Sequence, residues 1–132
     1  GVTLCIEALS PLETDFITTA QEALKLVDEM DHPNFKAILD VKAMSSEGKD
    51  IPSIIRSAKD RFRHLHANDA NKRGPGFGDT DFVPIAKALR EIGYDGYVSV
   101  EVFDFSPDPE TIASKSIEYL KKAFAWAFLL TA

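Results

Sequence analysis

Apolar residues in this chain form short runs that alternate with stretches of helical periodicity. The runs are rich in Val, Ile, Leu and Phe, which is typical of buried strands, and they cover 2–7, 35–40, 62–67 and 97–102. After each run, apolar residues recur at the three- and four-residue spacing of a helix, from about 14, 52, 81 and 109. Strands that alternate with helices predict parallel pairing and right-handed crossovers.

Local signals suggest where these elements begin and end. Thr14 can cap the first helix, with Asp15 in its first turn, and Asp81 can cap the third. Gly93 is expected to end that helix. The segments 41–50 and 68–80 are polar and predicted to be loops.

The order of elements predicts an α/β fold of four consecutive βα units over residues 1–122. Four such units are half of an eight-stranded barrel. The first and last strands would each leave one edge unpaired, so we expect a missing half-barrel or a second copy of the chain to complete the sheet. The apolar tail, 123–132, either extends the last helix or is a foreign end.

The composition of the chain argues against some classes of binding partner. The formal net charge is −6 and no helix carries a basic stripe, which argues against binding to nucleic acid through phosphates. The apolar cluster at 123–130 is too short to span a membrane, and the first residues do not resemble a signal peptide. A single cysteine, Cys5, excludes a disulfide framework and fits a reducing, cytoplasmic setting.

Four polar side chains end the four predicted strands: Glu7, Asp40, His66 and Glu101. Because the carboxyl ends of parallel strands meet at one edge of a sheet, we expect these side chains to converge. Three carboxylates and one imidazole form a ligand set that suits Mn²⁺, Mg²⁺ or Co²⁺ better than structural Zn²⁺, which favours thiolates.

Each of these residues also has a purely structural interpretation. Glu7 could pair with Lys72 or Arg73, and Asp40 could cap the segment that follows its strand. A lone buried histidine such as His66 is often only hydrogen-bonded. His64, two residues earlier, points the same way along the strand, and we interpret it as a supporting or core residue.

A metal at such a site predicts proton-transfer chemistry on a sugar. The ion would polarise a carbonyl and acidify the neighbouring C–H. Glu7 and Glu101 could then act as the acid–base pair, one removing a proton and the other returning it. Return to the opposite face gives an epimer, and return to the neighbouring carbon gives an aldose–ketose isomer.

The segment after the third strand is dense in hydrogen-bonding groups and glycine. Asn68, Asp69, Lys72 and Arg73 are candidate substrate contacts, because they can hold a hydroxyl, carboxylate or phosphate. The alternative is a solvated turn. It is not a P-loop, since no Gly-Lys-Ser/Thr sequence opens a helix.

Several motifs give the chain a resemblance to the sugar phosphate isomerase/epimerase family, the xylose-isomerase-like barrels. The resemblance covers nearly all of 1–122 and rests on the stretches 5–7, 39–44, 64–69, 74–82 and 98–103. It implies the C-terminal half of a TIM barrel, with Glu7, Asp40, His66 and Glu101 as metal ligands. It also implies that Glu7 and Glu101 are the acid–base pair and that Lys72 is a basic substrate contact.

Two departures from related families guide the choice of substrate. Ketose epimerases of this type often have a histidine three residues after the aspartate ligand, where this chain has Ala43, which disfavours a ketohexose epimerase. Apurinic endonucleases carry an Asp-x-His pair where this chain has Asp79-Thr80-Asp81, which disfavours a nuclease. An inactive fragment or a binding domain of the same fold is the main alternative to a sugar isomerase or epimerase.

Overall fold

The part of the chain that the structure describes forms four parallel strands that alternate with helices, as predicted. A computed structural model describes residues 1–129. The elements in chain order are β1 (Leu4–Glu7), α1 (Ala20–Met30), β2 (Phe35–Asp40), α2 (Val41–Ser45), α3 (Ile51–Ala58), a 3₁₀ turn η1 (Lys59–Arg61), β3 (Phe62–Ala67), α4 (Phe82–Glu91), β4 (Tyr97–Val100) and α5 (Pro109–Leu129). The first and last strands are shorter than the predicted 2–7 and 97–102.

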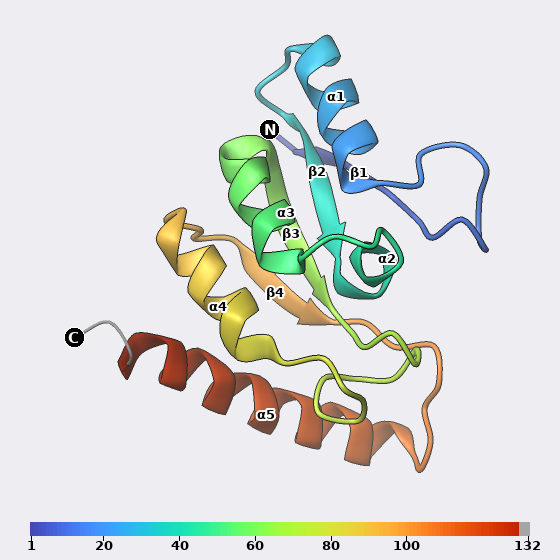
Figure 1. Ribbon diagram of the computed structural model, residues 1–132, viewed down its shortest axis with the longest axis vertical. Coiled ribbons are helices and arrows are strands. Elements are labelled where there is room, and N and C mark those ends of the chain that lie inside the picture. Colours follow the sequence, from blue (N-terminus) through green and yellow to red (C-terminus); the bar gives the residue numbers. More distant parts are fainter. Residues whose placement is uncertain (130–132) are drawn as a thin grey trace.

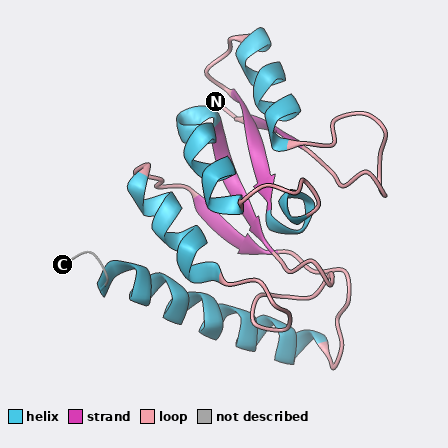
Figure 2. Ribbon diagram, in the orientation of Figure 1, coloured by secondary structure: helices cyan, strands magenta, loops and turns pink. Residues whose placement is uncertain are grey.

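The strands make one parallel sheet in the order β1-β2-β3-β4. Figure 1 shows α1, α3, α4 and α5 in a row along one side of this sheet, and Figure 2 shows the same alternation of strand and helix. Consecutive strands are neighbours and each is joined to the next by a helix. This is the arrangement of successive units in a (β/α)8 barrel, and it confirms the predicted fold class.

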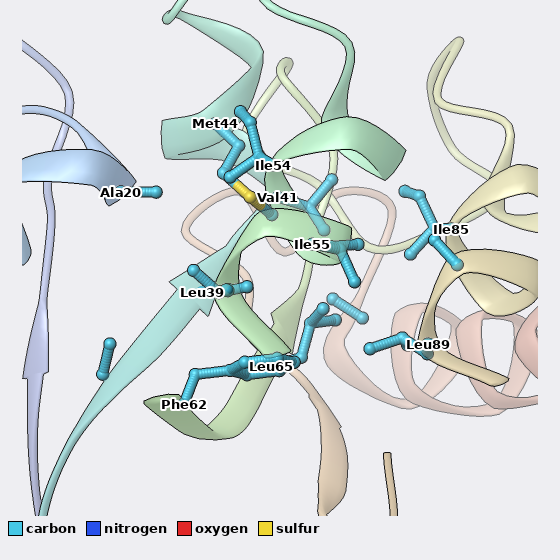
Figure 3. Packing of buried hydrophobic residues seen from close by; sticks show 14 of the residues in the cluster. Ala20, Leu39, Val41, Met44, Ile54, Ile55, Phe62, Leu65, Ile85 and Leu89 are labelled. Carbon is cyan, nitrogen blue, oxygen red and sulfur yellow. The ribbon is translucent and has the colours of Figure 1, made fainter. Parts of the chain in front are cut away.

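The core lies between the sheet and its helices. Leu39 and Leu65 point from the central strands into this layer and are almost fully buried, where they meet Ile55 and Leu89 from the helices (Figure 3). Alternate strand residues point the other way, and they include Ile38 and the functional candidates, which are mostly half-buried. The sheet therefore has one well-covered face and one face that these helices leave open.

The first helix starts five residues later than the predicted cap at Thr14. Thr19 is its N-cap, and a reciprocal capping box joins the Thr19 hydroxyl and backbone to Glu22. The Thr14 hydroxyl instead accepts the Phe16 N–H at 3.2 Å, which closes a short local turn. The prediction was wrong because it chose the first cap-forming residue and overlooked the stronger pair that follows.

The segment 41–50 was predicted to be a loop, but its first half is helical. α2 covers Val41–Ser45, and the Asp40 carboxylate caps it by accepting the Ala43 N–H at 2.7 Å. Other boundary predictions are confirmed: Asp81 caps α4, Gly93 follows that helix with φ +68°, and α5 begins at Pro109.

The last helix continues into the apolar tail. α5 reaches Leu129, and Ala123 and Ala127 are buried while Trp126 is exposed. Residues 130–132 of the tail lie outside the described residues. Within 1–129, none of the helices combines the length and the apolarity needed to cross a bilayer.

Candidate metal centre

Strand register brings the four candidate ligands to one edge of the sheet. Asp40 and His66 are direct partners across β2 and β3. Glu7 is the last residue of β1, while Glu101 follows β4 and donates its N–H to the Ala67 carbonyl at 3.2 Å. The four positions are staggered along the sheet: Glu7 pairs with Ile38, two residues before Asp40, and Glu101 lies two residues beyond Ser99, the partner of His66.

The tips of these side chains meet around the His66 imidazole. Its Nδ1 lies 2.8 Å from Glu7 Oε1, 3.3 Å from Glu101 Oε2 and 3.7 Å from Asp40 Oδ2. One ligand atom from each of the four residues lies within 4.8 Å of all the others. In the part of the chain that the structure describes, Glu7 contacts His66 and not Lys72 or Arg73, which removes the structural interpretation of Glu7 as a partner of those cations.

The cluster carries more negative than positive charge. The hydrogen bond to Glu7 raises the pKa of His66 above its usual value, against the opposing effect of burial. Burial raises the pKa of Glu101, and the nearby Glu7 and Asp40 carboxylates add to that effect, whereas His66 acts against it. Even a protonated imidazole offsets only one of three carboxylates. A divalent cation would relieve the remaining repulsion.

Asp40 caps the helix α2 and also belongs to the cluster around His66. Its Oδ1 accepts the Ala43 N–H at the start of α2, and its Oδ2 accepts an N–H from the Asn68 amide at 2.6 Å. The side chain is buried, yet Oδ2 still lies near His66. The sequence left a cap and a ligand as alternatives for Asp40, but the geometry allows both roles together.

His64 lies beside the cluster and one step further from the strand end. Its Nε2 is 2.7 Å from Ser99 Oγ, and its ring meets the His66 ring edge-on with centroids 5.0 Å apart. Burial lowers the pKa of His64, so its neutral form is favoured. His64 therefore packs edge-on against the ring of His66 and is itself held by Ser99.

Three of the four predicted substrate contacts bind within the protein. The Asn68 amide bonds to Lys42 and Asp40, and the buried Asp69 carboxylate accepts the Thr80 N–H at 3.0 Å. Arg73 donates to the Ser106 carbonyl, and its Nε lies 3.6 Å from Asp104 Oδ2. These contacts join the segment after β3 to its neighbours.

Lys72 differs from the other three. Its side chain is exposed and makes no hydrogen bond or ion pair with a described residue. Its backbone has φ +68°, and its carbonyl accepts the N–H groups of Phe103 and Asp104 at 2.9 and 3.0 Å. A non-glycine residue held in this conformation is strained, and such strain is concentrated at functional sites.

Sequence reasoning missed a partly buried ion pair beside the centre, between the buried Lys42 and the more exposed Glu13. Lys42 Nζ lies 2.7 Å from Glu13 Oε1 and 4.2 Å from the centroid of the Phe103 ring. The pair connects the segment after β1 to the start of α2, and Phe103 adds the segment after β4. No spacing in the sequence predicts this contact, because its partners lie 29 residues apart.

We expect Glu13→Gln to destabilise the chain at pH 7 by about 1 kcal/mol, less than a fully buried hydrogen bond to a charged group would cost, because the Glu13 side chain is 34% exposed and water screens the pair. Lys42 holds the pKa of Glu13 at about 2, below the ordinary value of 4.5. A lowered carboxyl pKa gives stability that is present above pH 4.5 and lost as the pH falls towards 2. Urea unfolding should show the difference between variant and wild type shrinking across that interval, and a difference independent of pH would contradict this account.

The fold and the cluster together define a half of an α/β barrel with an acidic, imidazole-containing centre at the carboxyl ends of its strands. The family model described as Xylose isomerase-like TIM barrel matches residues 1–123. The chain belongs to this family, which confirms the resemblance found in the sequence.

Individual relatives are named as sugar epimerases. The D-psicose 3-epimerase of Ruminiclostridium cellulolyticum is 41% identical over 103 residues, covering 78% of this chain and 35% of that protein. The D-psicose 3-epimerase of Agrobacterium fabrum is 36% identical over 103 residues, covering 78% of this chain and 36% of that protein. A solved structure of L-ribulose 3-epimerase matches with a TM-score of 0.87 and 25% identity over 100% of this chain and 52% of that chain.

These comparisons bear on the predicted missing half-barrel and on the interpretation of Ala43. The chain spans about a third of the length of the two curated relatives and about half of the solved chain. Ala43 was taken to disfavour a ketohexose epimerase, yet relatives with that activity in their names share more than a third of their aligned residues with this chain. Overall identity therefore favours ketose epimerases as relatives of this chain, although it has Ala43 at that position.

Proposed function

We propose that this chain is the metal-bearing half of an enzyme that inverts a carbon next to the carbonyl group of a ketose. The convergence of Glu7, Asp40, His66 and Glu101 carries the proposal. Four ligand-type side chains, each at or next to the carboxyl end of a separate strand, approach one another at one edge of the sheet. Burying several carboxylates together is costly unless a cation or hydrogen bonds compensate them.

The donor set fits a divalent ion. Three carboxylate oxygens and one imidazole nitrogen suit Mn²⁺, Mg²⁺ or Co²⁺, and they leave coordination positions for substrate oxygens. When bound, such an ion supplies polarisation of the sugar carbonyl and stabilises negative charge on its oxygen.

The two glutamates are placed to move the proton. One carboxylate takes the proton from the carbon beside the carbonyl, and the C–H electron pair moves toward the carbonyl oxygen. The other carboxylate returns a proton to the opposite face of the same carbon, so the configuration inverts. The raised pKa of Glu101 suits it to hold a proton closer to neutral pH than an exposed glutamate would. An epimerase rather than an isomerase is favoured because the named relatives are ketose 3-epimerases.

Capping contacts favour a free sugar over a sugar phosphate. Barrel enzymes commonly hold phosphate at helix N-termini near the ends of the last two strands. Here an acidic side chain already accepts a first-turn N–H of each helix: Glu47 at Ala20, Asp40 at Ala43, Asp50 at Ser53, Asp81 at Val83 and Asp108 at Thr111. Of the basic residues discussed above, Lys42 and Arg73 are already paired, so Lys72 is the one of these three cations that can contact the sugar, and a phosphate group is usually bound by more than one donor group.

A further half-barrel would complete the substrate pocket. The open face of the sheet and the unpaired outer edges of β1 and β4 match the half of the relatives that this chain does not cover. We propose that four further βα units cover this face, with a second copy of the chain as the alternative. We propose neither nucleic acid nor a membrane as a binding partner of this chain.

Hydrogen exchange at the sugar carbon tests this function. The chain is incubated with Mn²⁺ and D-fructose or D-fructose 6-phosphate in D₂O, and the C3 proton signal is followed by NMR. We expect exchange above the rate for Mn²⁺ alone, faster with the free sugar. Glu7→Gln and Glu101→Gln should each lower the rate by about 10²–10⁴-fold, as for a lost acid–base group. A chain that binds Mn²⁺ without catalysing exchange would favour a silent binding domain instead.

We expect Lys72→Gly to stabilise the chain while it weakens sugar binding. Glycine removes the left-handed strain, and its greater freedom in the unfolded chain offsets part of the gain, leaving about 0.5–1 kcal/mol. Lys72→Ala keeps the strain and removes the same ammonium group. Urea unfolding and the ketose concentration at half-maximal exchange would check this. Equal stabilities for the two variants, or an unchanged ketose dependence, would contradict it.

A further inference from the structure

Asn68 occupies a buried position just behind the metal centre. It follows β3 directly, two residues after His66, and its side chain is fully buried. Its Oδ1 accepts the Lys42 N–H at 2.7 Å, and its Nδ2 donates to Asp40 Oδ2 at 2.6 Å. Both ends of the amide are therefore occupied inside the protein.

These contacts restrict the Asp40 carboxylate. Its Oδ1 accepts the Ala43 N–H at 2.7 Å, so each oxygen has a donor from a different element. Rotation of the carboxylate would break both hydrogen bonds in a buried setting, where unpaired polar groups are costly. The oxygen that Asn68 holds is also the one that lies 3.7 Å from His66 Nδ1.

We propose that Asn68 is a positioning residue of the metal centre and does not contact the substrate directly. Its amide holds Asp40 Oδ2 toward His66, and its oxygen fixes the backbone turn from Asp40 into α2 through Lys42. This inference rests on the proposed function of the cluster as a metal site. Loss of such an outer partner usually lowers metal affinity by about 10- to 100-fold.

A purely structural role for Asn68 makes a different prediction. In that case the same hydrogen bonds would only stabilise the start of α2, and a folded variant would bind metal as the wild type does. Metal affinity and the coordination of the ion separate the two roles, whereas melting temperature alone does not.

Three variants test the proposal. Asn68→Ala removes both contacts. Asn68→Asp keeps the shape and an oxygen for the Lys42 N–H, and it cannot donate to Asp40 once the new carboxyl is ionised, so its metal affinity is measured as a function of pH. Asn71→Ala is the control, because the Asn71 amide lies in the same segment and, among residues 1–129, its hydrogen bonds are to the Phe77 carbonyl and the Arg73 N–H. Mn²⁺ affinity is measured by calorimetry, the d–d absorption spectrum of Co²⁺ reports the coordination, and circular dichroism confirms folding.

We expect Asn68→Ala and Asn68→Asp to bind Mn²⁺ about 10- to 100-fold more weakly than wild type and to change the Co²⁺ spectrum, with Asn71→Ala unchanged. If Asn68→Ala does not fold, Asn68→Asp decides the question. Wild-type affinity in folded Asn68→Ala, or in folded Asn68→Asp at every pH, would overturn the role of Asn68 and leave the metal centre intact. Failure of the wild-type chain to bind either ion would overturn both.

Discussion

Replacing Glu101 by glutamine should weaken Mn²⁺ binding and, at the same time, raise the thermal stability of the metal-free chain. Burial and the neighbouring Glu7 and Asp40 carboxylates raise the pKa of Glu101, so its ionised form is disfavoured in the folded chain. Glutamine removes that charge but also removes a metal ligand. We expect the loss of affinity to exceed the roughly 10- to 100-fold cost of losing an outer partner.

The pH dependence of the stability difference between Glu101→Gln and wild type tests whether the Glu101 charge causes it. A carboxyl whose pKa is raised on folding contributes stability that is present below its ordinary value of 4.5 and is lost as the pH rises through the folded pKa. The stability advantage of the metal-free Glu101→Gln chain should therefore be greatest near neutral pH and shrink toward pH 4.5. Glu110→Gln, which removes a carboxylate from the first turn of α5, is the control. A metal-free Glu101→Gln chain less stable than wild type at neutral pH would contradict the account.

Replacing Leu65 by alanine should cause the largest loss of stability. Leu65 is fully buried in the central strand β3, opposite the face that carries His64 and His66. Truncation of a buried leucine typically costs about 2–5 kcal/mol, which is a large part of the roughly 5–15 kcal/mol that stabilises a domain. Urea unfolding measures the change.

The exposed Leu12 provides a matched control. Its side chain is 98% exposed, so Leu12→Ala should change stability by no more than about 0.5 kcal/mol. Because Leu65 points away from the cluster, the folded fraction of Leu65→Ala should bind Mn²⁺ as wild type does. A small loss of stability, or weaker metal binding by folded protein, would show that the two faces of β3 are not independent.

The sequence was sufficient to predict the parts of this structure that depend on periodicity. Buried strands read as continuous apolar runs, and a polar residue at the end of each run marks the edge where parallel strands converge. This is why the convergence of Glu7, Asp40, His66 and Glu101 could be expected before their distances were known. Their role as ligands remains a proposal.

Other features depend on contacts between residues far apart in the chain. The pairing of Lys42 with Glu13, and the burial of Asn68 between Asp40 and Lys42, follow from how neighbouring segments pack, which periodicity does not encode. The start of α1 was misplaced for a local reason, because Thr14 and Thr19 are both suitable caps and only the second has a partner three residues later.

The proposed function requires that the four strand-end side chains bind one divalent ion. This can be seen in an anomalous difference map from crystals of the chain grown with Mn²⁺. We expect one strong peak among Glu7, Asp40, His66 and Glu101, at roughly 2.0–2.3 Å from an atom of each, the range for such ligands. A map with no peak there, or with Mn²⁺ bound only elsewhere on the surface, would contradict it.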